Sequence, residues 1–243
     1  MFKYCRFLGA LAFLTTTVPA PASIVFSDST FDLQDYSISV LQTGGATINY
    51  SQSLILGNPG PALQVTTFAP ASSIPLTSRE YFINNTFLYD PSVHGAALSI
   101  SYSSDNFGLR DAGTQPPWGA ALVIVQSGSY FLYSEALPAT YGAWVSGGAD
   151  NLLAEDFDLL TNLNSLAVDT TQHPSFASAM LFGTATGFSP SVPLASTWER
   201  RVDNFRIEIS TAVPEPSTLL LLLLTVPLLF GMRHISSGGE GDE

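Results

Sequence analysis

The sequence predicts an all-β fold, a two-sheet antiparallel β-sandwich, for the body of a chain of 243 residues. Three observations predict it. Apolar and polar residues alternate with period 2 in several stretches, as they do in half-buried strands. Turn-forming Gly, Pro, Asn and Asp interrupt the chain at short intervals. Charged residues make up only 12% of the chain and aromatic residues make up as much, which favours strands over solvated helices.

The charge balance excludes one class of partner. The chain holds 20 acidic residues against 8 Lys and Arg, a net charge of −12. Because so negative a surface repels phosphate backbones, we expect no nucleic-acid partner. The one cysteine, Cys5, lies in a segment that we expect to be removed, so the mature chain would carry no disulfide.

The N-terminal segment reads as a secretion signal. Basic Lys3 and Arg6 precede an apolar run from Phe7 to Leu14, and small residues follow up to Ala22. A positive start, a short apolar run and a small-residue cleavage site define a signal peptide. We therefore predict a signal peptide over residues 1–22, cleaved after Ala22, and a β-sandwich domain over residues 23–212.

Strands can be placed in the body from its periodicity. In 98–103, Leu98, Ile100 and Tyr102 alternate with serines, and in 204–209 Phe205, Ile207 and Ile209 alternate with polar residues. Each pattern puts one row on the core and one in solvent. The apolar run 121–125 predicts a central strand, and the turn 126–129 leads it into 130–133 as a hairpin.

Turn signals divide the rest of the body into about ten short strands, which favours a jelly-roll arrangement of the sandwich. They stand at Gly44-Gly45, Asn58-Pro59, Asp90-Pro91, Asp105-Asn106, Gln115-Pro116, Gly147-Gly148 and His173-Pro174. One stretch, 152–163, is a candidate helix, because Leu153, Phe157, Leu160 and Leu163 are spaced to fall on one helical face.

The C-terminal segment combines a proline motif with a short apolar run. Val213, Pro214, Glu215 and Pro216 precede the segment 219–232, and the basic Arg233 follows it. The two prolines keep a helix from extending back into the body. At about 1.5 Å per residue, a helix over 219–232 reaches roughly 21 Å, less than the roughly 30 Å of a hydrocarbon core. We therefore predict a marginal transmembrane helix.

This arrangement resembles the PEP-CTERM sorting signal, which exosortase-type transpeptidases recognise in the membrane. The resemblance covers 213–235, and an acidic tail, 236–243, follows where family members usually end in several arginines. It implies export across the inner membrane of a Gram-negative bacterium to the cell envelope, the cell surface or the extracellular matrix. It also implies two partners, the membrane and the sorting transpeptidase.

The order of motifs in the body loosely resembles jelly-roll and concanavalin-like modules. The opening Asp28 to Asp32, the Asn58-Pro59 turn and the closing stretch around Asp203 carry the likeness. In carbohydrate-binding modules of that kind, an Asp of the last strand joins the start of the first strand in binding a structural calcium ion. The resemblance implies such a site at Asp203 with Asp28 or Asp32.

Catalytic motifs do not appear in the sequence. There is no Gly-x-Ser-x-Gly elbow, no His-Glu-x-x-His helix and no phosphate-binding glycine loop. We predict no catalytic residue and a non-enzymatic protein. The alternative is a carbohydrate-active hydrolase on the same sandwich, with its carboxylate pair in Glu155 and Asp158 or in Glu199 and Glu208.

Sugar binding is easier to support from the composition. Trp118 follows two prolines in a predicted loop and is the best candidate for an exposed platform that stacks on a sugar ring. We therefore expect extracellular polysaccharide as a partner. Ice binding is a further alternative, but it needs a flat array of Thr, and the Thr residues are scattered.

Overall fold

The computed structural model describes residues 22–42, 44–71, 78–110, 120–133, 135, 140–163, 167–188 and 195–211. All of them lie in the compact unit Pro21–Ala212. Signal residues 1–21, the sorting motif and the segment 219–232 lie outside the described residues. In the part that is described, no helix has the length and apolar character needed to cross a membrane.

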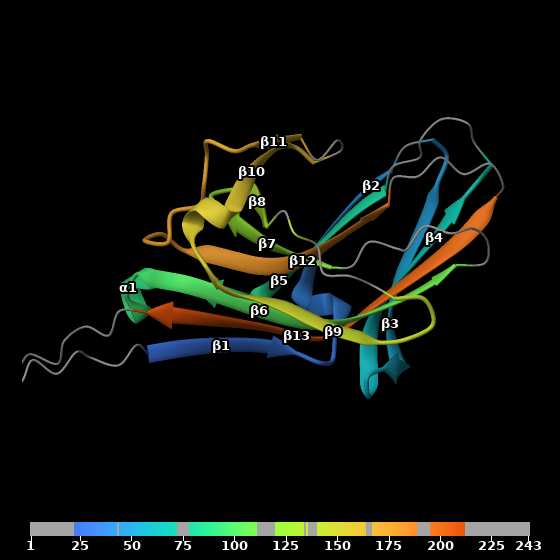
Figure 1. The fold of residues 1–243 in the computed structure, drawn as a ribbon, viewed down its shortest axis with the longest axis horizontal. Coiled ribbons are helices and arrows are strands. Elements are labelled where there is room, and N and C mark those ends of the chain that lie inside the picture. The colour runs from blue at the N-terminus through green and yellow to red at the C-terminus, as the bar shows by residue number, and fades with distance from the viewer. Residues whose placement is uncertain are drawn as a thin grey trace, which may run out of the picture. The chain divides into compact units, whose positions relative to one another are not determined.

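The described unit is a two-sheet antiparallel β-sandwich, as predicted (Figure 1). Sheet A has the order β3-β4-β13-β6-β9, and β1 pairs with β13 beside β4. Its strands are β1 (Ala22–Asp28), β3 (Thr47–Gly57), β4 (Gly60–Ala69), β6 (Ala97–Arg110), β9 (Val145–Leu152) and β13 (Ser196–Thr211).

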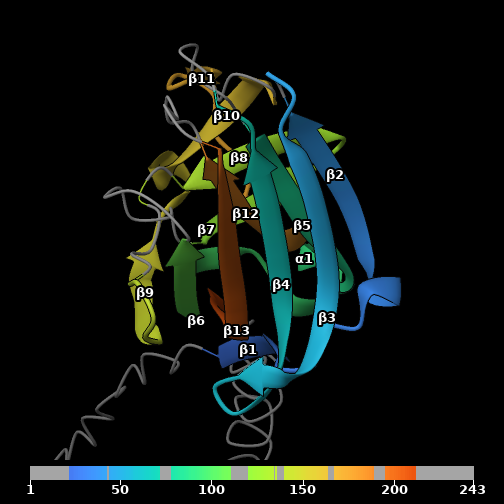
Figure 2. The same cartoon turned by 90° about the vertical axis from the view of Figure 1, so that its right-hand side faces the viewer.

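Sheet B has seven strands in the order β11-β10-β8-β7-β12-β5-β2. Their bounds are β2 (Tyr36–Gln42), β5 (Ser78–Tyr89), β7 (Ala121–Gln126), β8 (Ser129–Tyr133), β10 (Phe157–Asn162), β11 (Ala167–Asp169) and β12 (Met180–Phe188). Within the described ranges, three short helices interrupt the strands, namely η1 (Leu33–Asp35), α1 (Pro91–His94) and η2 (Ala154–Asp156). Figure 2 shows β3, β4, β13, β6 and β9 side by side across the front of the sandwich.

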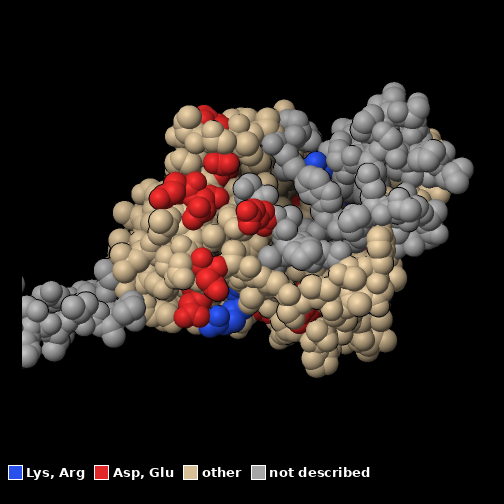
Figure 3. Space-filling model, in the orientation of Figure 1, with Lys and Arg blue, Asp and Glu red and all other residues tan. Residues whose placement is uncertain are grey.

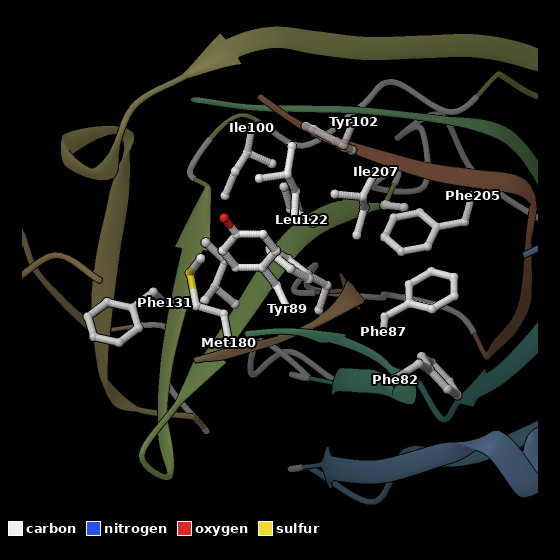
Figure 4. Packing of buried hydrophobic residues seen from close by; sticks show 14 of the residues in the cluster. Phe82, Phe87, Tyr89, Ile100, Tyr102, Leu122, Phe131, Met180, Phe205 and Ile207 are labelled. Carbon is white, nitrogen blue, oxygen red and sulfur yellow. The ribbon is translucent and has the colours of Figure 1, made fainter. Parts of the chain in front are cut away.

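The core lies between the sheets, where aromatic and branched side chains from both point toward one another (Figure 4). Phe87 of sheet B stacks on Phe205 of sheet A, with ring centroids 6.3 Å apart and planes 7° apart. Ile207 and Leu122 are fully buried beside them. Because each large apolar side chain stabilises the fold by about 1.5–3 kcal/mol when buried, this layer holds the two sheets together.

Most of the strands placed from periodicity are confirmed. The stretches 98–103 and 204–209 lie in β6 and β13, which pair with each other. The hairpin of β7 and β8 is also confirmed, and its turn residues Ser127 and Gly128 have φ values of 51° and 80°, as a two-residue hairpin turn requires.

Three predictions of local structure are wrong. Leu98 is 52% exposed, because the β6–β13 register shifts opposite Ser210 and turns this side chain out of the apolar row. Asp105-Asn106 is not a turn but part of β6, where both side chains find hydrogen-bond partners. Gly147-Gly148 is not a turn either. A Cβ on Gly148 would lie 2.4 Å from the Tyr102 carbonyl oxygen, so glycine allows β9 to approach β6.

The predicted helix over 152–163 is also wrong. The segment contains the end of β9, the single turn η2 and strand β10. Phe157 packs into the core between the sheets, while Leu160 and Leu163 pack into a second apolar cluster with Tyr81, on the opposite face of sheet B. A strand that is covered on both faces has apolar residues on both, and here their spacing imitated a helical period.

Candidate functional site

The outer face of sheet A carries a polar groove of about 300 Å³. It lies where β6 runs between β9 and β13. The lining residues are Ser101, Tyr102, Ser103, Asp150, Asn151, Arg206, Glu208 and Ser210. We call this site the serine groove.

Strand register places these side chains in rows across the sheet. Ser101 of β6 pairs with Glu208 of β13, and Ser103 pairs with Arg206. On the other side of β6, the register with β9 shifts near Asn151, which has φ of 56° and donates its N–H to Ser101 Oγ at 3.0 Å. The extra residue makes a β-bulge in β9, and Asp150 and Asn151 at this bulge line the hollow.

The charges of the serine groove are mixed. Arg206 Nη2 donates to Glu208 Oε2 at 2.7 Å, and these side chains are 46% and 35% exposed. Hydrogen bonds from Arg206 and Ser23, together with the Arg206 charge, hold the pKa of Glu208 below its usual range. Asp150 has neither an ion pair nor a hydrogen bond through its side chain to any other described residue. On the face seen in Figure 3, acidic side chains clearly outnumber basic ones.

An acidic cluster lies further along the same strands, where Asp203 of β13 pairs with Asp105 of β6. Both are buried, at 0% and 8% exposure. Asp203 accepts hydrogen bonds from the backbone N–H groups of Asn58 and Asn204. Asp105 accepts from the side chains of Asn204 at 2.7 Å, Asn58 at 3.2 Å and Ser146. The β3–β4 turn therefore covers two neighbouring carboxylates.

The predicted calcium residue Asp28 lies near this cluster but has other partners. Its Oδ1 accepts from the Thr30 N–H and hydroxyl and from the Phe31 N–H, at 2.7–2.9 Å. Its Oδ2 accepts from the Tyr36 hydroxyl at 2.7 Å and from Asn84 Nδ2 at 3.4 Å. Asp28 thus connects β1 of sheet A to β2 and β5 of sheet B.

Asp32, the other predicted calcium residue, is exposed and accepts from the Gln34 N–H at 3.0 Å, as the N-cap of η1. Asp105 and Asp28 lie close enough to Asp203 for their charges to affect its pKa. Among the described residues, no group of three or more His, Cys, Asp or Glu is arranged to hold a metal ion.

Burial and charge act against ionisation of Asp203. Burial raises its pKa, the N–H groups of Asn58 and Asn204 lower it, and the nearby charges of Asp105 and Asp28 raise it again, so that the result is a raised pKa. Asp28 behaves in the opposite way. Burial raises its pKa, but the hydrogen bonds that it accepts outweigh burial and leave that pKa lowered.

The three tryptophans have different positions. Trp118, the predicted platform, lies outside the described residues. Trp198 is buried at 1% exposure and donates to Ser196 Oγ at 2.9 Å, so it belongs to the interior. Trp144 is partly exposed and packs against Phe107, with ring centroids 5.5 Å apart.

The two carboxylates of one pair considered for hydrolysis, Glu199 and Glu208, lie too far apart along β13 to act together. Glu199 pairs with Arg201 and Glu208 with Arg206, and Glu208 lies nine positions beyond Glu199 along β13. At about 3.3 Å per residue, that separation approaches 30 Å, far beyond the roughly 5–10 Å of a glycosidase pair. In the other pair, Glu155 is exposed in η2 and Asp158 lies 4.0 Å from His173 Nδ1.

No family model matches the chain, and no curated protein matches its sequence. Among solved structures, the family 11 carbohydrate-binding module of the cellulosomal cellulase Lic26A-Cel5E of Clostridium thermocellum is similar at 11% identity and a TM-score of 0.41, over 80% of this chain and 97% of that one. The CBM22-1 xylan-binding domain of Paenibacillus barcinonensis Xyn10C is similar at 14% identity and a TM-score of 0.36, over 80% of this chain and 100% of that one. The mannan-recognising module TmCBM27 is similar at 10% identity and a TM-score of 0.37, over 78% of this chain and 99% of that one. At this level of similarity, function has to be argued from the residues of the chain itself.

Proposed function

We propose that this chain is an exported, non-enzymatic β-sandwich protein that binds extracellular polysaccharide at the cell surface or in the extracellular matrix. The observation that carries the proposal is the serine groove, a hollow that presents hydroxyl, amide, carboxylate and guanidinium groups to solvent. Groups of these kinds bond sugar hydroxyls, which both donate and accept. The sequence features at the two chain ends are the basis for the proposed export and localisation.

Delivery rests on the predicted signal peptide 1–22 and on the sorting segment 213–235 with Val213, Pro214, Glu215, Pro216 and Arg233. In this account the chain crosses the inner membrane, is held there by 219–232, and is then processed by an exosortase-type transpeptidase. These parts decide where the sandwich is displayed and leave binding to the body.

The non-enzymatic part of the proposal is tested against its alternative, a glycan hydrolase. The double variant Glu155→Gln/Asp158→Asn should bind polysaccharide as the unmodified chain does, because neither residue lies in the serine groove. Neither protein should release reducing ends from a neutral polysaccharide. Release by the unmodified chain that the double variant loses would instead establish the hydrolase.

A structural calcium ion remains part of the proposal. Asp105 and Asp203 supply hard oxygen donors, the type that calcium prefers, and neither of them takes part in an ion pair with another described residue. Burial, and after it the nearby charges of Asp105 and Asp28, raise the pKa of Asp203, and a cation there would offset the charge repulsion. Asp28 fits less well, since five hydrogen bonds already satisfy its two oxygens.

A further inference from the structure

We infer that the serine groove binds a neutral, hydroxyl-rich sugar unit, with Asp150 as acceptor and Arg206 as donor, and that it discriminates against anionic sugars. This inference rests on the proposed function and adds to it the binding face, the chemical class of the ligand and the residues that recognise it.

The position of the charged residues makes the groove suited to adjacent sugar hydroxyls. Asp150 lines the groove and its side chain has no partner among the described residues, so its carboxylate is available to accept two hydrogen bonds. Arg206 uses Nη2 on Glu208 and keeps further N–H donors for a ligand. Two neighbouring hydroxyls match a carboxylate or a guanidinium in a bidentate way, and such charge-assisted hydrogen bonds are strong.

The remaining lining residues agree with a polar, uncharged ligand. Ser101, Ser103 and Ser210 contribute small hydroxyl side chains, which leave room near the sheet surface. A volume of about 300 Å³ is at the lower end for small-ligand sites, which suits a short stretch of sugar chain. The described residues that line the groove include no Trp, so recognition by them works through hydrogen bonds.

Charge decides which sugars are excluded. Two carboxylates, Asp150 and Glu208, face one guanidinium in the groove, and the whole chain carries a net charge of −12. A uronate or sulfate group would meet this excess of negative charge and would have to compete with Glu208 for Arg206. A neutral sugar meets no such penalty.

The test uses the full chain, solubilised in a detergent that has no sugar head group. The probes are neutral polysaccharides (mixed-linkage glucan, xylan and mannan) and the anionic polygalacturonate, measured by affinity electrophoresis. Asp150→Ala and Arg206→Ala should each weaken binding of a retained neutral polysaccharide by roughly tenfold or more, as expected for hydrogen bonds to charged groups. Of the four polysaccharides, polygalacturonate should retard the migration of the protein least.

The matched control is Glu199→Ala. Glu199 lies on β13 and pairs with Arg201, as Glu208 pairs with Arg206, but it does not line the groove. The affinity of the Glu199→Ala variant for the neutral polysaccharide should stay within twofold of that of the unmodified chain. Near-ultraviolet circular dichroism of each variant checks that the fold is retained.

The outcomes separate the two claims. If a neutral polysaccharide is retained but Asp150→Ala and Arg206→Ala bind it as tightly as Glu199→Ala, the groove is not the site, and polysaccharide binding by another surface stands. If polygalacturonate retards the unmodified chain more than the neutral polysaccharides do, the charge argument is overturned. If none of the four polysaccharides retards the unmodified chain, both this inference and polysaccharide binding are overturned.

Discussion

At the scale of single residues, an ion pair stands out inside the sandwich. Arg200 of β13 and Glu80 of β5 are 3% and 0% exposed, and their charged atoms lie 3.1 Å apart. Thr186 donates to the same Glu80 oxygen at 2.6 Å, and Arg200 donates to Thr67 and to the Gly187 carbonyl. The pair therefore joins sheet A to sheet B through buried polar contacts.

Removing one partner of this pair should be costly. Arg200→Met would remove the guanidinium that lies 3.1 Å from the buried Glu80 carboxylate, so we expect a loss of about 3–5 kcal/mol in the free energy of unfolding by urea. The control is Arg206→Met, which breaks the exposed pair with Glu208 and should cost at most about 1 kcal/mol. Equal losses for the two variants would contradict the role given to the buried pair.

A second prediction concerns the pH dependence that Asp203 confers. An acid whose pKa is higher in the folded state than in the unfolded state binds its proton more tightly when folded. Asp203 therefore makes the free energy of unfolding fall as pH rises from 3.8 through its raised pKa. Asp28, with a lowered pKa, has the opposite effect below pH 3.8.

Asp203→Asn should remove that fall, so its unfolding free energy, measured in urea from pH 4 upward, should decline less than that of the unmodified chain. Asp32→Asn is the control, because Asp32 is exposed and only caps η1. A decline in Asp203→Asn as steep as in the unmodified chain would show that another group titrates in this range.

At the scale of elements, the packing of the strands depends on close approach at particular glycines. Gly183 lies in β12 between β5 and β7, and a Cβ there would sit 2.1 Å from the Phe82 carbonyl oxygen. On the same strand, the nearest atom to a Cβ on Gly187 would be Nη1 of Arg79, at 2.9 Å. Backbone in a central strand cannot move aside, whereas the end of an arginine can.

We therefore expect Gly183→Ala to lower the free energy of unfolding by about 3 kcal/mol, at the upper end of the cost of overpacking. Gly187→Ala should cost roughly 1 kcal/mol or less. Urea denaturation of the two variants measures this difference. A greater loss for Gly187→Ala would contradict the close approach of β12 to β5 at Gly183.

The elements also show how far sequence reasoning reaches. Alternation in 98–103 and 204–209 identified β6 and β13, because apolar periodicity records which face is buried. The serine groove could not be located in this way. Ser101 and Glu208 were recognised as solvent-facing, but that they lie opposite each other depends on a pairing between strands about a hundred residues apart, which local patterns do not encode.

The acidic cluster of Asp105 and Asp203 could not be predicted from the sequence for a related reason. Asp105 and Asn106 carry the signature of a turn, and in isolation their side chains would favour one. In the fold, Asn204, Asn58 and Ser146 donate to Asp105, and these tertiary bonds hold it in a strand. Asp203 was singled out through a family resemblance and not through periodicity.

At the scale of the whole molecule, calcium should raise the stability of the sandwich. An ion that binds only the folded state raises the midpoint of thermal unfolding, by an amount that grows with its concentration. We expect a higher midpoint in calcium than in chelator, and a smaller difference in Asp203→Asn than in Asp32→Asn. Identical midpoints with and without chelator would remove calcium from the account.

We propose that this sandwich is exported and binds polysaccharide without cleaving it. The most direct measurement is a pull-down of the full chain on a panel of insoluble and immobilised polysaccharides, in calcium and in chelator, with reducing ends assayed in each supernatant. The account predicts retention on at least one neutral polysaccharide and no release of reducing ends. Absence of retention across the panel, or cleavage of the polysaccharide that retains the chain, would contradict it.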